Sequence, residues 1–482
     1  MWYNIEEDEV LFMIDLSNFK IWLSDHFMYS QRTISNIVSR FKRANSIINW
    51  FDNPIYNYHL EQTNEFSELP IDIKAQIKKA VKLYFQFNDS LTKTPIIDKG
   101  ENMKILSLFA NIGVAEAYLN NIGFDVVIAN ELIERRAALY SKIYPNVNMI
   151  CGDITTSEIQ HRIVELSKQL DVEIIMATPP CQGMSTAGQQ KEDDIRNSLI
   201  CPVVKIVKEI KPKYVIIENV PLFLSTTIEI DGRMILIPEY LEKELAEDYN
   251  IIKQVINVKD YSVPQTRERA VILMSRKENP IWTIPNKDGK LVTLYDAIGN
   301  LPMLDPYVTD ITEEELIRLF PHYYERKETA NKISVWHNPP HHILRQVVAM
   351  QHTPTGCTAF DNLVYYPKKN DGTPVKGYHN TYKRQNWNTP AYTVTMDNRK
   401  ISSQNNVHPG RPEYINENGE QIYSDPRTLT LYELMIVSSL PSDWPVPRNT
   451  SEAFLRRVIG EGIPPLFVKK VFEKLKEVRH ND

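Results

Sequence analysis

A cysteine and a glutamate follow neighbouring apolar runs of the sequence, and both residue types can take part in covalent chemistry. Cys181 lies in Thr-Pro-Pro-Cys-Gln after the run 172–177, and Glu218 lies at the end of the run 214–219. Two prolines stiffen the approach to Cys181, and a cysteine near backbone N–H groups can have a lowered pKa and act as a nucleophile. In a doubly wound sheet Glu218 would lie beside Cys181, where a buried carboxyl could be protonated and donate to a ring nitrogen.

Acidic residues follow two further apolar runs and indicate a nucleoside site. The run 103–110 leads into the turn Phe-Ala-Asn-Ile-Gly at 109–113, and Glu131 and Asp153 follow the next two runs. A turn after a first parallel strand binds nucleotide-like ligands, and an acid about 20 residues on can accept two ribose hydroxyl hydrogen bonds. Asp153 could accept from an adenine amino group, with Ile154 against the ring. Each acid alone could simply cap a helix. The turn at 109–113, Glu131 and Asp153 follow three successive predicted strands, and together they favour a nucleoside site. Since no GxGxxG occurs, S-adenosylmethionine fits better than NAD.

The elements that must position these residues alternate between apolar runs and amphipathic stretches. This alternation predicts a parallel sheet with helices on both faces, in the α/β class. Residues 10–95 have helix spacing, with Ser30 or Thr33 as a cap for a helix that ends near Trp50. From 280 to 425 the periodicity weakens, which predicts loops and short strands. From 429 helical periodicity returns. The predicted strands are 103–110, 124–130, 146–150, 172–177, 214–219, 251–258 and 270–275.

Composition describes an ordinary globular chain. It has 482 residues, a formal net charge of −6 and 42% apolar residues. No run reaches the ~18 apolar residues of a membrane helix, and the acidic start predicts no signal peptide. The four cysteines are not in CxxC spacing. We therefore expect a cytoplasmic protein with no membrane segment, disulfide framework or zinc ribbon.

In combination, these motifs resemble the cytosine-5 DNA methyltransferase family. The resemblance is carried by FANIG, NE, GDI, PPCQ and ENV, followed by YSVPQTRER at 261–269. It covers 103–275 strongly and 376–475 well. It implies a Rossmann-like methyltransferase domain that uses S-adenosylmethionine, with a small inserted target-recognition domain and a helical N-terminal domain.

The resemblance assigns catalytic roles by motif. In the family the PPCQ cysteine attacks C6 of a cytosine flipped out of the duplex, which implies this role for Cys181. It implies that Glu218 contacts N3 and the exocyclic amine, and that Arg269, the second arginine of QxRxR, holds the base O2. Arg267 is expected to order the catalytic loop. The base must leave the stack because C6 cannot be reached inside the duplex, and no metal is needed.

The resemblance also implies a cofactor pocket. Phe109 would stack on the adenine, Glu131 would bind the ribose, and Asp153 and Ile154 would lie at the adenine. The other residues expected to line the pocket are Ala110, Asn111, Gly113, Pro180, Leu199 and Glu461.

Three positions depart from the family pattern. Asn111 replaces a usual Gly, although Asn tolerates a left-handed turn. Ser107 stands where an Asp is common. Glu461 replaces an Asn near the expected position of the cofactor's methionine carboxylate. Either Glu461 points away, as a solvated residue at a helix entry would, or cofactor affinity is reduced.

The C-terminal half carries later motifs of the family and a basic stretch. WNTPAYTVT at 387–395 resembles part of the target-recognition domain, and HP, RTLT, LP and IGEGIPP follow at 408, 427, 440 and 459. Between Tyr366 and Arg411, eight Lys or Arg face two Asp, with aromatic residues interleaved. This composition suits a DNA-reading surface, although a solvated loop face is the alternative. The expected DNA contacts are Gln182, Ser185, Gln265, Lys383, Arg384, Thr393, Thr395 and Arg399.

The segment before residue 100 lies outside the resemblance. Residues 16–50 carry five basic residues and one acid, and a row of lysines follows at 74–82. Parts of it weakly resemble the helical core-binding domain of tyrosine recombinases, which clamps DNA. A packing or partner domain is the alternative. His337, His341 and His342 have no Cys or carboxylate in ligand spacing, so we expect no metal site.

These observations predict a sequence-specific DNA (cytosine-5)-methyltransferase. The expected domains are 1–97, a helical domain that clamps DNA or binds a partner; 98–280 with 429–482, the catalytic domain; and 281–428, the target-recognition domain. The expected partners are double-stranded DNA and a cognate restriction endonuclease encoded nearby, in a bacterium or phage. The alternatives are an RNA cytosine methyltransferase and a non-catalytic DNA-binding protein such as a repressor.

Overall fold

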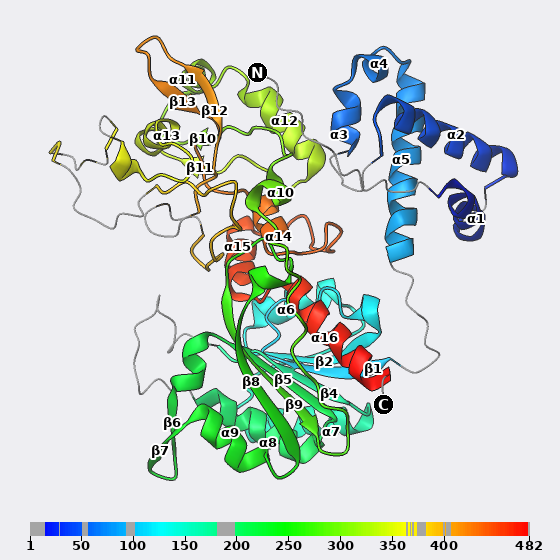
Figure 1. Cartoon of the computed structure of the whole chain (residues 1–482), viewed down its shortest axis with the longest axis vertical. Coiled ribbons are helices and arrows are strands. Elements are labelled where there is room, and N and C mark those ends of the chain that lie inside the picture. The colour runs from blue at the N-terminus through cyan, green and yellow to red at the C-terminus, as the bar shows by residue number, and fades with distance from the viewer. Residues whose placement is uncertain are drawn as a thin grey trace. The chain divides into compact units, whose positions relative to one another are not determined.

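The computed structural model divides the chain into two compact units, residues 1–99 and 100–482 (Figure 1). The residues that the structure describes are 15–27, 29–50, 56–92, 102–180, 198–362, 365–366, 368, 371–373, 382–398, 401 and 406–480. Cys181, Gln182, Ser185 and Arg399 lie outside these residues.

The first unit consists of helices, as the sequence predicts, and these helices pack around an aromatic core. Ser30, one of the two caps considered, accepts a hydrogen bond from the Thr33 N–H at the start of α2. Tyr84 stacks on Phe41 and meets Phe19 and Trp50 edge-on. Its helices are α1 (Leu16–His26), α2 (Gln31–Ile47), α3 (Tyr56–Glu61), α4 (Asn64–Ser67) and α5 (Ile71–Thr92).

The second unit is built on a seven-stranded mixed sheet with the order β3-β2-β1-β4-β5-β9-β8. The first five strands in this order run parallel, and β9 runs antiparallel to both of its neighbours. All seven predicted strands are confirmed. Their bounds are β1 (Met103–Leu108), β2 (Phe124–Glu131), β3 (Asn148–Cys151), β4 (Ile174–Ala177), β5 (Tyr214–Asn219), β8 (Tyr249–Asn257) and β9 (Glu268–Arg276).

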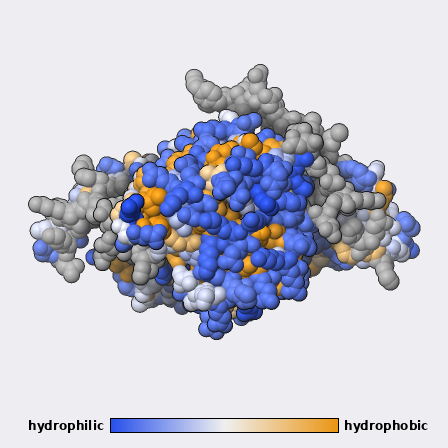
Figure 2. Space-filling view, turned by 90° about the horizontal axis from the view of Figure 1, so that it is seen from below, coloured by the Kyte–Doolittle hydropathy of each residue, from blue (hydrophilic) through white to orange (hydrophobic). Residues whose placement is uncertain are grey.

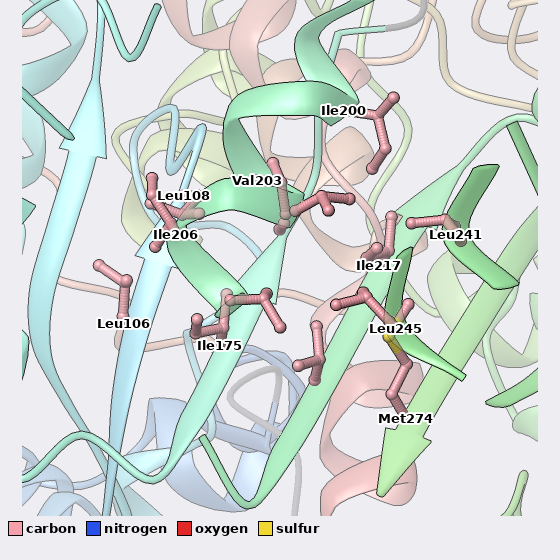
Figure 3. Packing of buried hydrophobic residues seen from close by; sticks show 14 of the residues in the cluster. Leu106, Leu108, Ile175, Ile200, Val203, Ile206, Ile217, Leu241, Leu245 and Met274 are labelled. Carbon is pink, nitrogen blue, oxygen red and sulfur yellow. The ribbon is translucent and has the colours of Figure 1, made fainter. Parts of the chain in front are cut away.

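Alternate residues of each strand pack against different helices. One set of strand side chains projects toward α8 (Ile200–Ile210) and α9 (Ile237–Leu245) (Figure 3). This set includes Leu106, Ile175 and Ile217, which pack in one cluster with Val203 of α8 and Leu241 of α9. Helices α6 (Glu134–Ile143) and α7 (Ser157–Gln169) complete the crossovers between the parallel strands, and the hairpin β6 (Thr227–Ile230) and β7 (Arg233–Leu236) precedes α9. Burial on both faces explains why the strands are almost continuously apolar.

The opposite face of the sheet is covered by the last helix of the chain. In α16 (Pro465–His480), Phe467, Val471 and Phe472 pack on Ile105 of β1 and Ile216 of β5. Helices α14 (Leu431–Val437) and α15 (Glu452–Glu461) lead into it. Seen from below, most of the visible described surface is hydrophilic, and apolar residues appear in separate groups (Figure 2). The apolar residues of α8, α9 and α16 pack against the sheet.

The 281–428 region contains more helix than the sequence analysis predicted. Two of its helices begin with capping boxes, in which Thr293 pairs with Asp296 and Thr312 with Glu315. These boxes are a readable start signal that the prediction of loops and short strands overlooked. The elements are α10 (Leu294–Ile298), β10 (Tyr307–Val308), α11 (Glu313–Leu319), α12 (Tyr323–Ile333), β11 (His341–His342), α13 (Leu344–Gln351), β12 (Pro412–Ile415) and β13 (Gln421–Tyr423).

Candidate active site

The turn after β1 has an unusual backbone. Phe109 and Asn111 have φ angles of 59° and 51°, and Gly113 has 81°. A Cβ atom at Gly113 would lie 2.1 Å from the Tyr144 ring, so only glycine fits there. Left-handed residues other than glycine cost roughly 1–3 kcal/mol each and collect at ligand sites. Asn111 bears out the expectation that Asn can replace Gly in this turn.

Glu131, at the end of β2, is fixed by backbone hydrogen bonds. Its Oε2 accepts from the Asn111 N–H and its Oε1 from the Ile133 N–H, both at 2.9 Å. The side chain is 6% exposed. Each oxygen therefore keeps acceptor capacity for one more donor, in a fixed orientation beside the β1 turn.

The other expected pocket residues differ in exposure. Asp153 is exposed, and its Oδ1 accepts from both the backbone N–H and the hydroxyl of Thr155. Ile154 is 4% exposed and belongs to the sheet core, so little of it faces solvent. Ala110 is also buried, whereas Pro180 and Leu199 are half-buried.

Glu218 and Arg269 form an ion pair at the same edge of the sheet. Their side chains lie 2.6 Å apart, from Nε to Oε1, and each is 12% exposed. Because β5 and β9 are paired antiparallel, Glu218 faces Val271, which places Arg269 near the end of β5. A carboxylate and a guanidinium can together contact the edge of one planar base.

Asn219 ties this pair to the segment that leads to Cys181. Its Nδ2 donates to the Pro179 carbonyl at 3.0 Å, and its Oδ1 accepts from the Val220 N–H at 2.8 Å. Asn219 is 3% exposed. This role of Asn219 was not predicted from the sequence, although its place directly after Glu218 was a usable signal.

Arg267 lies two residues before Arg269 and has a different environment. It is 3% exposed, and its guanidinium donates to the carbonyls of Val394, Gly460 and Glu461 at 2.8, 3.0 and 3.4 Å. It thereby joins the QTRER loop to the TVT segment and to the end of α15.

Two of the expected DNA contacts are wrong. Gln265 is 1% exposed and bonds the Val437 carbonyl and the Val394 N–H. Arg384 is fully buried, and its guanidinium donates to the carbonyls of Met350, His408 and Asp425. Neither side chain can reach a phosphate, because the polar atoms of each are buried and hydrogen-bonded inside the fold.

The remaining expected DNA contacts are closer to solvent. Thr393 is exposed, and its hydroxyl donates to the Thr266 carbonyl at 2.6 Å. Lys383 is half-buried, with its Nζ 5.2 Å from the centre of the Tyr392 ring. Thr395 is half-buried. Their contacts to DNA stay a prediction.

Glu461 is paired with arginine rather than solvated alone. Its Oε2 lies 2.7 Å from Arg136, and both side chains are about one-sixth exposed, 16% and 15%. Arg457 lies 3.3 Å from its other oxygen. Nearby, the Asn111 side chain donates to the Val458 carbonyl at 3.2 Å. Arg136 was not predicted from the sequence as the partner of Glu461, although an acid at an unexpected position is itself a signal for a nearby cation.

Glu116 is buried beneath the turn and has no cation recorded beside it among the described residues. The Ser107 hydroxyl donates to it at 2.5 Å, and Tyr140 donates to its other oxygen. Burial raises the pKa of Glu116 to about 7, against the lowering effect of these hydrogen bonds. Ser107, which departs from the usual Asp, therefore partners a carboxyl that comes from Glu116.

His337 and His342, two of the three histidines considered as metal ligands, form hydrogen bonds inside the fold. The His337 ring bonds the Thr430 hydroxyl at 2.9 Å, and His342 accepts from the Thr428 N–H at 3.1 Å. No group of three or more His, Cys, Asp or Glu among the described residues could hold a metal ion. No described helix is long and apolar enough to cross a membrane.

Comparisons with known proteins agree on one family. The family described as C-5 cytosine-specific DNA methylase matches residues 103–477. The chain is 40% identical over 380 residues to the type II methyltransferase M1.HgaI of Avibacterium volantium, covering 78% of this chain and 98% of that protein. It is 24% identical over 387 residues to the type II methyltransferase M1.HphI of Haemophilus parahaemolyticus, covering 79% and 88%.

A solved structure shares the fold. It is described as a DNA modification methyltransferase encoded within a prophage (E. coli), with a TM-score of 0.52 and 18% sequence identity. It covers 79% of this chain and 100% of that chain. The predicted α/β methyltransferase fold is thus confirmed.

Proposed function

Because the chain belongs to the C-5 cytosine-specific DNA methylase family and is a DNA (cytosine-5-)-methyltransferase, we propose how it works. It methylates C5 of a flipped-out cytosine within a short double-stranded sequence, through a covalent adduct on Cys181. The observation that carries this proposal is the Glu218–Arg269 pair, which Asn219 ties to the approach to Cys181.

The strand order supports separate positions for the cofactor and the cytosine along the sheet edge. Asp153 follows β3, Glu131 ends β2, and the left-handed turn follows β1. Asp153 and Glu131 would hold the adenosine of the cofactor and the turn after β1 would hold its methionine part, next to β4, after which Cys181 follows in the sequence. Glu218 and Arg269 belong to the next two strands, so the base would lie beyond β4 on the side away from the adenosine.

The residues at this edge fit S-adenosylmethionine. Glu131 has one free acceptor site on each oxygen, which suits the two ribose hydroxyls. The buried Asn111 Oδ1 has no hydrogen-bond partner within the described residues, and an ammonium group would supply one. Leu132 and Ile133, 62% and 44% exposed, offer more apolar surface for an adenine ring than the buried Ile154 does.

When bound, this cofactor supplies an electrophilic methyl group. The thiolate of Cys181 adds to C6 of the cytosine, and the electron pair of the C5–C6 double bond then takes up the methyl group at C5. Loss of the C5 proton restores the double bond and expels Cys181. Glu218 contacts N3 and the amino group, and Arg269 donates to O2, so the ring is held in place and activated toward addition.

Arg267 acts as a positioning residue in this proposal. Its three carbonyl bonds fix the loop that carries Arg269 against the TVT segment and the α15 end. An unpaired buried guanidinium is costly, so these bonds hold the loop in one arrangement.

The test is transfer of labelled methyl groups from S-adenosylmethionine to unmethylated plasmid DNA, with mapping of 5-methylcytosine. Wild type should label one short motif, and Cys181→Ser should lose turnover while it still folds and binds DNA. Substantial activity in Cys181→Ser would remove the nucleophile assignment. Transfer to RNA but not DNA would favour the RNA methyltransferase alternative, and binding without any transfer would favour a repressor.

Trapping tests the covalent step directly. A duplex with 5-fluorocytosine at the target cannot lose the C5 substituent as a proton, so the adduct should persist. We expect a complex that survives SDS in wild type and is absent in Cys181→Ser. A wild-type complex that SDS dissociates would contradict the addition mechanism.

We further propose that the enzyme serves a restriction–modification system in the cytoplasm of a bacterium or phage host. The type II names of its relatives support this role. The implied partner is a restriction endonuclease with the same target sequence. Plasmid methylated by the protein should resist that nuclease, whereas plasmid from the Cys181→Ser strain should be cut.

A further inference from the structure

One face of α2 in the first unit is exposed, basic and free of acidic residues. Exposed residues along it are Arg32, Ser35, Asn36, Ser39, Lys42, Arg43 and Ser46, and we name this set the α2 outer face. The buried residues of α2 are Ile34, Ile37, Val38, Phe41 and Ala44. Because the two sets alternate with helical spacing, the α2 outer face points away from the core.

The cations of this face have no ion-pair partner within the part of the chain that the structure describes. The sequence of α2 contains four basic residues and no Asp or Glu. Among the described residues, no salt bridge or cation–π contact is recorded for Arg32, Lys42 or Arg43. Their charge is therefore available to an external anion.

The lysines of α5 provide a contrast within the same unit. Lys78 pairs with Glu61 at 2.5 Å, Lys79 lies 5.5 Å from the centre of the Tyr29 ring, and Lys74 donates to the Ser67 carbonyl. Each of these contacts occupies the cation inside the unit. The sequence shows only that both helices are rich in basic residues. The structure shows that these cations of α5 have partners inside the unit, whereas among the described residues those of the α2 outer face do not.

We propose that the α2 outer face binds the duplex DNA on which the enzyme acts, a partner that rests on the function proposed above. Arg32 and Arg43 are eleven residues apart, about 16 Å along the helix, enough to reach across a major groove about 12 Å wide. Arginine and lysine bind phosphates, and the serines and Asn36 between them are short enough for the helix to approach the DNA closely. The unit lies outside the family match at 103–477, so it adds contacts beyond the catalytic unit.

The test compares two triple variants of the full chain with equal changes of charge. The first is Arg32→Gln/Lys42→Gln/Arg43→Gln on α2, and the matched control is Lys74→Gln/Lys78→Gln/Lys79→Gln on α5. Affinity for a fluorescent duplex of about three helical turns, roughly 30 bp, is measured from low to high salt. Each lost phosphate contact lowers the slope of log K against log salt by about 0.9.

We expect the α2 variant to lower the slope by about 2 to 3 and to bind at least roughly tenfold more weakly at 0.1 M salt. The α5 variant should stay within about twofold of wild type. A wild-type slope in the α2 variant, or an equal loss in the α5 variant, would overturn the proposal. Helical content by circular dichroism checks folding, and Ser39→Glu, which places an acid on the face and favours the helix, should also weaken binding.

Parallel assays separate this inference from the proposed function. If wild type transfers methyl groups but its salt slope does not depend on α2, the inference alone fails. If the slope depends on α2 but no methyl transfer occurs on DNA or RNA, the proposed function alone fails.

Discussion

Glu116 and Glu433, two glutamates buried in the described part of the second unit, are accommodated in opposite ways. Glu116, beneath the β1 turn, meets the hydroxyls of Ser107 and Tyr140, and burial raises its pKa to about 7. Glu433, at the start of α14, pairs with Arg427, and its pKa falls to about 2 despite burial, because of that arginine and His408. The first site thus favours a neutral acid and the second a charged one.

The difference shows what each region can supply. The side-chain partners of Glu116 are the hydroxyls of Ser107 and Tyr140, so this buried acid is most stable when it is protonated. The junction between the 281–428 region and α14 contains little regular structure, and Arg427 donates hydrogen bonds to polar groups of its loops. Its guanidinium bonds Asp425, Glu433 and the Leu304 carbonyl at 2.8 to 2.9 Å. Charge there replaces part of the apolar packing.

The largest expected effect is from Arg427→Met, which removes the cation that both carboxylates share. Asp425 and Glu433 would be left buried and uncompensated, and breaking such a pair costs about 3–5 kcal/mol. We expect a clear fall in the midpoint of urea unfolding, followed by tryptophan fluorescence. Arg318→Met, at an exposed position in α11, is the matched control and should change stability by less than about 0.5 kcal/mol. Equal behaviour of the two variants would mean that the buried network contributes nothing.

The same substitution at the two glutamates should give unequal results. Glu433→Gln removes the charge that Arg427 bonds and should cost about 1.5–3 kcal/mol near neutral pH. Glu116→Gln replaces an acid that is largely neutral with a neutral amide of the same shape, so below pH 6 its cost should be smaller. Urea unfolding of both variants, beside wild type, measures this difference. Comparable losses in the two variants at pH 6 would remove the distinction between the sites.

The pH dependence of the two sites should have opposite signs. The raised pKa of Glu116 means that its stabilising effect is complete below the usual 4.5 and is lost as pH rises toward about 7. The lowered pKa of Glu433 means that its contribution is present above 4.5 and lost as pH falls toward about 2. Glu116→Gln should therefore flatten the decline between pH 4.5 and 7, whose limit is about 1.4 kcal/mol per pH unit. An unchanged profile in Glu116→Gln would contradict the raised pKa.

The two regions also differ in how far the sequence predicts them. Strands such as β4 and β5 are short apolar runs that end in polar motifs, so their type and order could be read from pattern alone. The pairing of Glu218 with Arg269 then follows from strand adjacency. In the 281–428 region the stabilising residues are arginines, and Arg384, which looks like a DNA ligand in the sequence, bonds three carbonyls in the interior. Charge in a sequence does not say whether its partner is a phosphate or a carbonyl.

Contacts between residues far apart in the sequence could not be predicted from local sequence pattern. Glu116 and Ser107 lie nine residues apart, but Tyr140 joins them from the next helix. Arg136 and Glu461 are 325 residues apart, the difference of their numbers. No periodicity connects such positions, because only the return of α15 and α16 to the sheet brings them together.

Glu461 is a third carboxylate, intermediate in burial, and its pairing with Arg136 gives the smallest predicted effect. Arg136→Met leaves Glu461 with only the exposed Arg457, close to the turn where a methionine carboxylate would bind. Repulsion should raise the KM for S-adenosylmethionine about tenfold, or about 1.4 kcal/mol, with little change in kcat. Glu461→Gln should change KM much less, and the double variant should recover most of the loss, because the repelling charge is then gone.

If instead the pair only holds α15 against α6, Glu461→Gln will be as harmful as Arg136→Met and the double variant will not recover. Steady-state kinetics at saturating DNA therefore decide whether Arg136 neutralises a charge at the cofactor pocket or simply fastens two helices.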